Sequence, residues 1–440
     1  MANSNQEASS NSEKEQLKAF LSQRMHRELM KGATGTLSRD DVVNTVEREF
    51  ATIDTRLDDQ EKDAFFSEIA GEFTSYGILQ EFVDDPGVSE IMVNGPRQIF
   101  VERDGRLEDT DVKFNDNDEI EQFIQRLVKP LGYSINARNP AIDARLPDGS
   151  RINAIIPPVA VDGPTITVSK FSPDKLGMPD LVENNSVNGR VAEFLEACVN
   201  ARLNILVSGG AGSGKSTLMN ILSGFIPDNE RIVAIEDSAE LQIRQKHVVR
   251  LETKPPDSNG RGGMSTRDLV RNALRMRPDR LLVGEVRSSE ALDLLRAMNN
   301  GYDGSITTLH ANSPRDAVGR LETLCMTAGI DLPIATVQRQ IASAVDLVVQ
   351  LNRLSDGSRK VSHVTEVSGM EGENVVMTDI YRFEQSGTAA SGKVRGEFKP
   401  TGIRPHFVPR LEAAGFHMRS SMFVPENGEK PVVINVKKRH

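Results

Sequence analysis

The segment 209–216 has the residue types and the spacing that bind nucleotide phosphates. Its sequence, GGAGSGKS, satisfies the pattern G-x-x-x-x-G-K-[ST], and it lies between the apolar run LNILVS and the helical pattern TLMNILSGF. Glycines let backbone N–H groups turn towards phosphate oxygens, and a helix N-terminus adds partial positive charge. Lys215 would then reach the β- and γ-phosphates, and the Ser216 hydroxyl would complete a Mg²⁺ shell. The alternative is a Gly-rich turn that only joins a strand to a helix, which both flanking patterns disfavour.

Carboxylates at the ends of two further apolar runs are candidates for the hydrolytic step. RLLVGE ends in Glu285 and has no Asp, so we assign Glu285 the orientation or deprotonation of the attacking water. RIVAIED ends in Glu236 and Asp237; Glu236 is a candidate partner for Mg²⁺-bound water, whereas Asp237 could equally cap the next helix. In a parallel sheet both strand ends open beside the phosphate loop. A solvated acid at a sheet edge remains the alternative for Glu285.

One histidine and two groups of arginines complete the candidate set. His310 follows a fourth apolar run in GSITTLHANSP, where it could sense the γ-phosphate or be a satisfied structural residue. Arg145 and Arg151, in an earlier part of the chain, are candidates to stabilise transition-state charge as arginine fingers. The segment TRDLVRNALRMRPDR offers four more along an expected helix: Arg267, Arg271, Arg275 and Arg277. Solvated helix faces and acidic partners are the alternative for each arginine.

These residues need a sheet that brings strand ends together. Across 182–352, helical patterns alternate with short apolar runs: NILVSG, RIVAIED, RLLVGEV, GSITTLH and DLVVQL. Apolar runs between helices predict a buried parallel sheet, and therefore an α/β fold. Residues 353–440 predict further strands and a C-terminal subdomain.

The N-terminal part of the chain has other patterns. Residues 1–11 are polar and predicted to be disordered, and 12–76 contain three amphipathic segments that predict a helical bundle. Residues 77–170 alternate short strands with one helix, with Asp104-Gly105 as a hairpin turn, and predict an α+β domain. The Pro- and Gly-containing stretch 171–181 is the expected linker.

Composition narrows the function. The 440 residues fit two or three domains, and the net charge of −10 argues against a general nucleic-acid binder. The only two cysteines, Cys198 and Cys325, are too few for a disulfide framework or a zinc cluster, so we expect a reducing compartment and no structural metal. No apolar run reaches the roughly 18 residues of a membrane span, and the polar N-terminus does not resemble a signal peptide. Any membrane role is expected to depend on a partner.

Four blocks in this order resemble the secretion ATPase superfamily of type II and type IV secretion and type IV pili. GGAGSGKST, IVAIEDSAEL, RMRPDRLLVGEVR and GSITTLHANSPRDAVGRLETL look like its Walker A motif, Asp box, Walker B motif and His box. Within it, MVNGPRQIFVERDGRL, DARLPDGSRINAIIPP and VTEVSGMEGENVVMTDIYRFE resemble the CpaF-type ATPase of Tad (Flp) pili. The resemblance covers roughly residues 75–420.

The resemblance implies a cytoplasmic homohexamer that uses ATP and Mg²⁺, peripheral to the inner membrane through pilus platform proteins. It implies a RecA-like motor domain preceded by a PAS-like domain, with nucleotide bound between them. The family pattern places the catalytic acids on Glu236 and Glu285 and the sensor on His310. It places phosphate binding on six residues of the loop: Gly212, Ser213, Gly214, Lys215, Ser216 and Thr217.

Two other functions stay open at this stage. A RecA-like nucleic-acid translocase or helicase shares the core fold, although the acidic balance counts against it. A nucleotide-binding scaffold without hydrolysis is the third, and the presence of both Glu236 and Glu285 argues against it. Stimulation of turnover by DNA would favour the translocase, and binding without turnover would favour the scaffold.

Overall fold

The chain divides into two compact units, Met1–Lys175 and Leu176–His440. The disordered segment expected at 1–11 and nearly all of the helical bundle expected at 12–76 lie outside the described residues. The division falls inside the expected linker, 171–181, but a helix, α6 (Met178–Glu183), already begins within that stretch. The computed structural model describes residues 47–48, 76–103, 105–170, 176–254, 256, 261–390 and 392–425.

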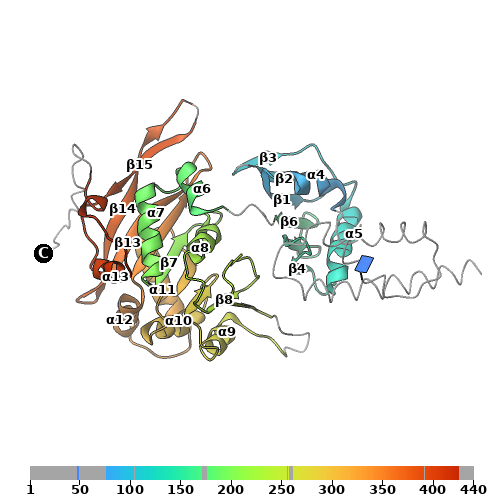
Figure 1. The fold of residues 1–440 in the computed structure, drawn as a ribbon. Coiled ribbons are helices and arrows are strands. Elements are labelled where there is room, and N and C mark those ends of the chain that lie inside the picture. The colour runs from blue at the N-terminus through green and yellow to red at the C-terminus, as the bar shows by residue number, and fades with distance from the viewer. Residues whose placement is uncertain are drawn as a thin grey trace, which may run out of the picture. The chain divides into compact units, whose positions relative to one another are not determined.

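The first unit is built on an antiparallel sheet of six strands in the order β3-β2-β1-β6-β5-β4 (Figure 1). The pairing of Arg103 with Arg106 confirms the hairpin predicted between β2 and β3. Helix α5 (Asn117–Val128) begins at Asp116, whose side chain accepts from Glu119 N, and its apolar side is buried in the same core as the strands. The strands are β1 (Val88–Asn94), β2 (Ile99–Arg103), β3 (Arg106–Asp109), β4 (Ala141–Arg145), β5 (Arg151–Ile155) and β6 (Thr165–Ser169). Before them lies the short helix α4 (Gln80–Asp84).

The second unit contains one sheet of nine strands in the order β15-β14-β13-β12-β7-β11-β10-β8-β9. The six strands from β12 to β9 are parallel to their neighbours, and the remaining pairs are antiparallel. The predicted α/β fold with a buried parallel sheet is therefore confirmed. The strands are β7 (Ile205–Gly209), β8 (Ile232–Glu236), β9 (Val248–Glu252), β10 (Arg280–Val283), β11 (Ile306–His310), β12 (Leu347–Arg353), β13 (Arg359–Glu371), β14 (Asn374–Thr388) and β15 (Val394–Pro400).

Helices cover both faces of the parallel strands, which explains why those strands read as continuous apolar runs. Along β7, Ile205 and Val207 lie in one core with α7, α8 and α13, whereas Leu206 lies in a second core with α9 to α12 (Figure 1). The helices are α7 (Gly189–Asn200), α8 (Lys215–Ser223), α9 (Thr266–Ala273), α10 (Glu290–Asn299), α11 (Pro314–Met326), α12 (Ile334–Ala344) and α13 (Val408–Ala413).

The region after residue 352 differs from its prediction. The further strands predicted there are present, but they do not form a separate subdomain: β13 pairs with β12 over Arg359–Glu366, and β14 and β15 continue the same sheet. This region therefore extends the core sheet beyond the parallel strands.

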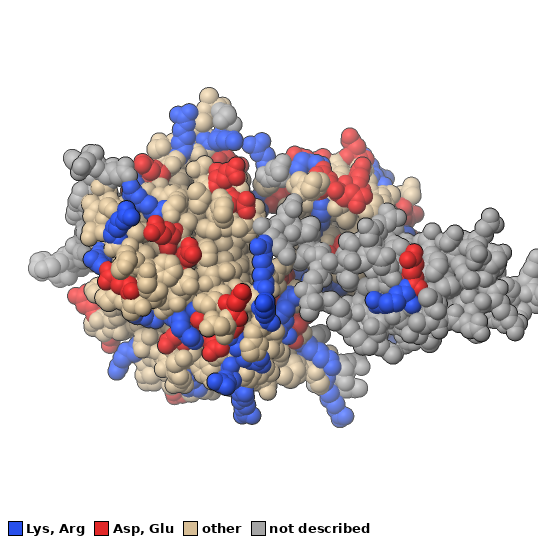
Figure 2. Space-filling model, in the orientation of Figure 1, with Lys and Arg blue, Asp and Glu red and all other residues tan. Residues whose placement is uncertain are grey.

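Two further features of the described residues are the character of the helices and the distribution of charge on the surface. Among the described residues, no helix combines the length and the apolar character needed to cross a bilayer. Figure 2 shows one face of the molecule, on which acidic and basic side chains are interspersed over the described residues.

Candidate functional site

The phosphate loop connects β7 to α8. Every residue of β7 is buried, so the strand is a fixed support for the loop. Gly214, at the N-cap of α8, has a φ of 96°, a left-handed conformation that favours glycine. The first turn of α8 exposes the side chains of Ser216 and Thr217. The predicted strand–loop–helix context of this motif is therefore confirmed.

Lys215 lies inside the loop. Its side chain is largely buried, and Nζ donates to the carbonyl oxygen of Gly210 at 2.9 Å. The hydroxyl of Ser213 donates to the same carbonyl at 2.9 Å. Burial lowers the pKa of Lys215, whereas the nearby charge of Glu285 raises it. An amino group held here can exchange its carbonyl contact for a phosphate oxygen within the same loop.

His310 connects Lys215 to Glu285. Lys215 Nζ lies 3.4 Å from His310 Nδ1, and His310 Nε2 lies 3.0 Å from Glu285 Oε1. Burial, followed by the charge of Lys215, lowers the pKa of His310, which favours the neutral ring. Because an ammonium group can only donate, Nδ1 accepts and the ring proton lies on Nε2, from which it is donated to Glu285. Three residues predicted from separate sequence blocks thus form one chain of contacts.

Glu236, at the end of β8, lies beside the strand that carries Glu285. A Cβ built on Gly284 would lie 3.0 Å from Glu236 Cγ, so the two strand ends are in close contact. Oε1 of Glu236 accepts from the backbone N–H groups of Glu240 and Leu241 at 2.9 and 2.8 Å. Burial raises the pKa of Glu236 to about 7, although these hydrogen bonds lower it. Glu236 is therefore a carboxyl group that can exchange a proton near neutral pH.

Asp237 and Arg287 form the outer part of this site. No helix follows Asp237 directly, so its alternative role as a helix N-cap is wrong. Its carboxylate accepts from Thr266 Oγ1 at 3.0 Å and from Arg287 Nη1 at 2.9 Å. Arg287 Nε also donates to Glu285 Oε2 at 2.7 Å. Sequence reasoning missed Arg287, although its place two residues after Glu285 was an available signal.

Of the four arginines predicted along one helix, two pair with an acid and two lie beyond the helix. Arg267 and Arg271 both pair with the buried Asp293, at 2.7 and 3.1 Å. For these two residues the alternative prediction, an acidic partner, is therefore the one observed. Helix α9 ends at Ala273, so Arg275 and Arg277 lie beyond the helix on which we placed them.

Arg145 and Arg151 belong to the other unit. They are directly opposite each other on β4 and β5, and Arg151 Nε donates to Asp143 Oδ1 at 2.8 Å. Their role at the phosphates stays a prediction.

The donor set fits Mg²⁺. The ion prefers hard oxygen ligands and is commonly held by one or two protein groups together with phosphates and water. Ser216 offers an exposed hydroxyl in the first turn of α8, and the carboxylates of Glu236 and Glu285 lie at neighbouring strand ends. Among the described residues there is no cluster of three or more His, Cys, Asp or Glu side chains that could hold a metal alone. Ser216 would therefore hold the ion together with the phosphates.

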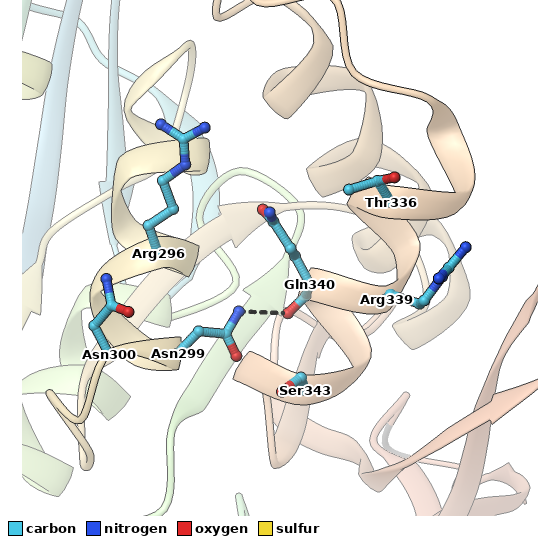
Figure 3. Close-up of a pocket in the computed structure, with 7 residues that line it drawn as sticks. All are labelled: Arg296, Asn299, Asn300, Thr336, Arg339, Gln340 and Ser343. Carbon is cyan, nitrogen blue, oxygen red and sulfur yellow. Dashed lines mark hydrogen bonds between the residues drawn. The ribbon is translucent and has the colours of Figure 1, made fainter.

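A groove of about 490 Å³ lies elsewhere in the unit, between α10 and α12 (Figure 3). Asn299 Nδ2 donates across it to the carbonyl oxygen of Gln340 at 3.0 Å. Its lining residues include none of the candidates above and are Arg296, Asn299, Asn300, Thr336, Arg339, Gln340 and Ser343.

Comparison with known proteins identifies a family and several similar proteins. Residues 72–395 match the family described as "Type II/IV secretion system protein". A putative conjugal transfer protein of Mycobacterium tuberculosis is 33% identical over 313 residues, which cover 70% of this chain and 88% of that protein. The type IV secretion system protein VirB11 of Bartonella quintana is 30% identical, over 65% of this chain and 90% of that protein. A crystal structure of the VirB11 ATPase from Brucella suis is 29% identical, covers 65% of this chain and 91% of its own, and has a TM-score of 0.37.

The match extends over parts of both units and includes all four sequence blocks that carry the site residues. Together with the phosphate loop and the contacts of Lys215, His310 and Glu285, it shows that the chain belongs to the family of type II/IV secretion system proteins and is an ATPase of that family.

Proposed function

We propose that the chain is the hexameric ATPase motor of a Tad-type pilus or a related secretion system. The family match supports a secretion ATPase, and the CpaF-like sequence blocks support the Tad assignment. The motor would be cytoplasmic, would bind the inner membrane only through platform proteins, and would drive pilus extension, and retraction, by ATP-dependent domain motion.

The chain of contacts from Lys215 through His310 to Glu285 is the observation that carries the hydrolytic part of this proposal. ATP would bind with its β- and γ-phosphates at Lys215, and Mg²⁺ beside Ser216 would neutralise phosphate charge. Glu285 would orient or deprotonate the attacking water, because its carboxylate lies next to the phosphate loop and is held by Arg287 and His310.

His310 would report the state of the γ-phosphate. Its contact with Lys215 is long, 3.4 Å, and Lys215 would shift towards phosphate when ATP binds. That shift would weaken the contact between Lys215 and His310 Nδ1 and leave Glu285 as the main partner of the histidine. Glu236, with its raised pKa, would accept or return a proton during the cycle.

Movement of the first unit, Met1–Lys175, which we call the small unit, would couple ATP turnover to force. Arg145 and Arg151 would approach the phosphates when the stretch 171–181 acts as a hinge, and withdraw by several ångströms when the cleft opens. Structures of the hexamer with and without a non-hydrolysable ATP analogue test this. One orientation of the small unit in every subunit and every nucleotide state would contradict the hinge.

The motor assignment is tested in cells that lack the endogenous protein. Wild type should restore pili, whereas Glu285→Gln should bind ATP, fail to restore pili and co-purify with inner-membrane platform proteins. Glu252→Gln, an exposed strand-end carboxylate, is the matched control and should behave as wild type. Pili restored by Glu285→Gln would rule out ATP-driven assembly by this chain.

A nucleic-acid translocase is the second candidate, because several relatives are named conjugal transfer proteins. The net charge of −10 and the interspersed charges of the visible face count against it. ATPase assays with and without single- and double-stranded DNA decide: a several-fold stimulation would favour the translocase over the pilus motor.

A further inference from the structure

The hairpin formed by β12 and β13 lies against the phosphate loop. Strand β12 is parallel to β7 in a register that places Leu351 beside Gly209, so its last residues extend past the start of the loop. Arg353 ends β12 and is directly opposite Arg359, the first residue of β13. Two arginines from a distant part of the chain are therefore brought to the level of the loop.

Both arginines approach the loop closely. Arg359 Nε donates to the carbonyl oxygen of Gly212 at 2.8 Å, and its Cδ lies 3.5 Å from the place that a Cβ on Gly214 would take. Arg353 Nη1 lies 3.5 Å from the corresponding place on Gly212. A carbonyl held from outside favours the loop conformation in which N–H groups face the phosphates.

The turn that carries these arginines is firmly held. Leu354 N donates to Ser358 O at 2.8 Å, and Asp356 accepts from the Ser358 hydroxyl at 2.6 Å. The second oxygen of Asp356 accepts from Val394 N on β15 at 2.7 Å. Burial raises the pKa of Asp356, but these hydrogen bonds outweigh it and lower the pKa to about 2. The turn between β12 and β13 is therefore held by hydrogen bonds, one of which joins it to β15, the outer strand of the sheet.

We propose that Arg353 and Arg359 are additional residues of the nucleotide site. Arg359 is a positioning residue that shapes the loop through Gly212, and Arg353, which is exposed, presents positive charge beside the loop to the phosphates of ATP and ADP. A guanidinium group binds phosphate well, because its planar set of N–H donors matches the phosphate oxygens. The inference rests on the ATPase assignment and is independent of the pilus motor.

The test uses full-length variants and two measurements. The dissociation constant for a fluorescent ADP analogue reports binding, and steady-state kinetics separate kcat from KM. Arg359→Ala and Arg353→Ala should each raise the Kd for ADP and the KM for ATP about tenfold, the effect of one charge-assisted hydrogen bond, and leave kcat within about twofold. Arg359→Lys keeps a donor and should recover part of the affinity. Arg395→Ala, an exposed arginine on β15, is the control and should change neither constant.

Four outcomes would count against the proposal. The first is a wild-type Kd for ADP in folded Arg359→Ala or Arg353→Ala protein. The second is a fall in kcat at constant KM, which would place these arginines in the chemical step instead of in binding. If the alanine variants do not fold, Arg353→Gln and Arg359→Gln carry the test, and wild-type affinity in both is the third. Loss of pilus assembly with normal nucleotide binding would speak against the inference and leave the motor assignment intact.

Discussion

Replacement of Glu236 by glutamine should change how the stability of the protein depends on pH. Glu236 is 5% exposed, and burial raises the pKa of its carboxyl from 4.5 to about 7. Between these values the unfolded chain loses its proton readily, whereas the folded chain retains it. The stability associated with the neutral group is therefore complete below about pH 4.5 and is lost as pH rises through about 7.

The pKa values set the size of the effect. The difference between about 7 and 4.5 is about 2.5 units, and at about 1.4 kcal/mol per unit it corresponds to at most about 3.5 kcal/mol. Glutamine has the same shape and keeps an acceptor oxygen for the N–H groups of Glu240 and Leu241, but it does not ionise. Relative to wild type, Glu236→Gln should therefore gain stability as pH rises. For a unit of this size the gain corresponds to about 7–14 °C in Tm at most.

Thermal unfolding of the full chain without nucleotide measures this difference in stability between wild type and Glu236→Gln. Wild type and Glu236→Gln should unfold at similar temperatures near pH 5 and diverge by about pH 8, with the variant more stable. Glu252→Gln is the control, because this carboxylate is exposed at the end of the neighbouring strand. A Tm difference between wild type and Glu236→Gln that stays constant over this range would refute the link between burial and proton affinity at Glu236.

Three further substitutions test the site. Lys215→Ala should abolish turnover and weaken nucleotide binding, because the phosphates lose a point charge; near-normal ATPase activity of the folded variant would contradict the assignment. Glu285→Gln should bind ATP in an equilibrium assay and not hydrolyse it, whereas failure to bind would make Glu285 a ligand or a structural residue. Gly284→Ala should lower the free energy of unfolding by about 1–3 kcal/mol and reduce activity, because the new Cβ would lie 3.0 Å from Glu236 Cγ. Gly319→Ala, in α11 with no atom within 4 Å of the added Cβ, should be neutral or stabilising, and equal losses in both variants would contradict this reasoning.

The sequence alone determined the features that depend on short segments. The pattern at 209–216 predicted the phosphate loop because its glycines, lysine and serine act through neighbouring backbone groups. The apolar runs predicted a parallel sheet because strands covered on both faces have few polar positions. Glu236, Glu285 and His310 could be placed together because the carboxyl ends of parallel strands lie at one edge of a sheet. The order of the strands was not needed for that step.

Only the tertiary structure decided which residues that are far apart in the chain contact one another at the site. Asp237 pairs with Arg287 and Thr266, and the strands after residue 352 join the core sheet. Neither feature could be predicted, because hydrogen bonds between remote segments leave no periodic signal in the sequence of either segment. The contact of Arg359 with Gly212 joins residues 147 positions apart in the chain. Its existence depends on the parallel register of β12 with β7, which follows from the packing of the whole sheet and not from the sequence of either strand.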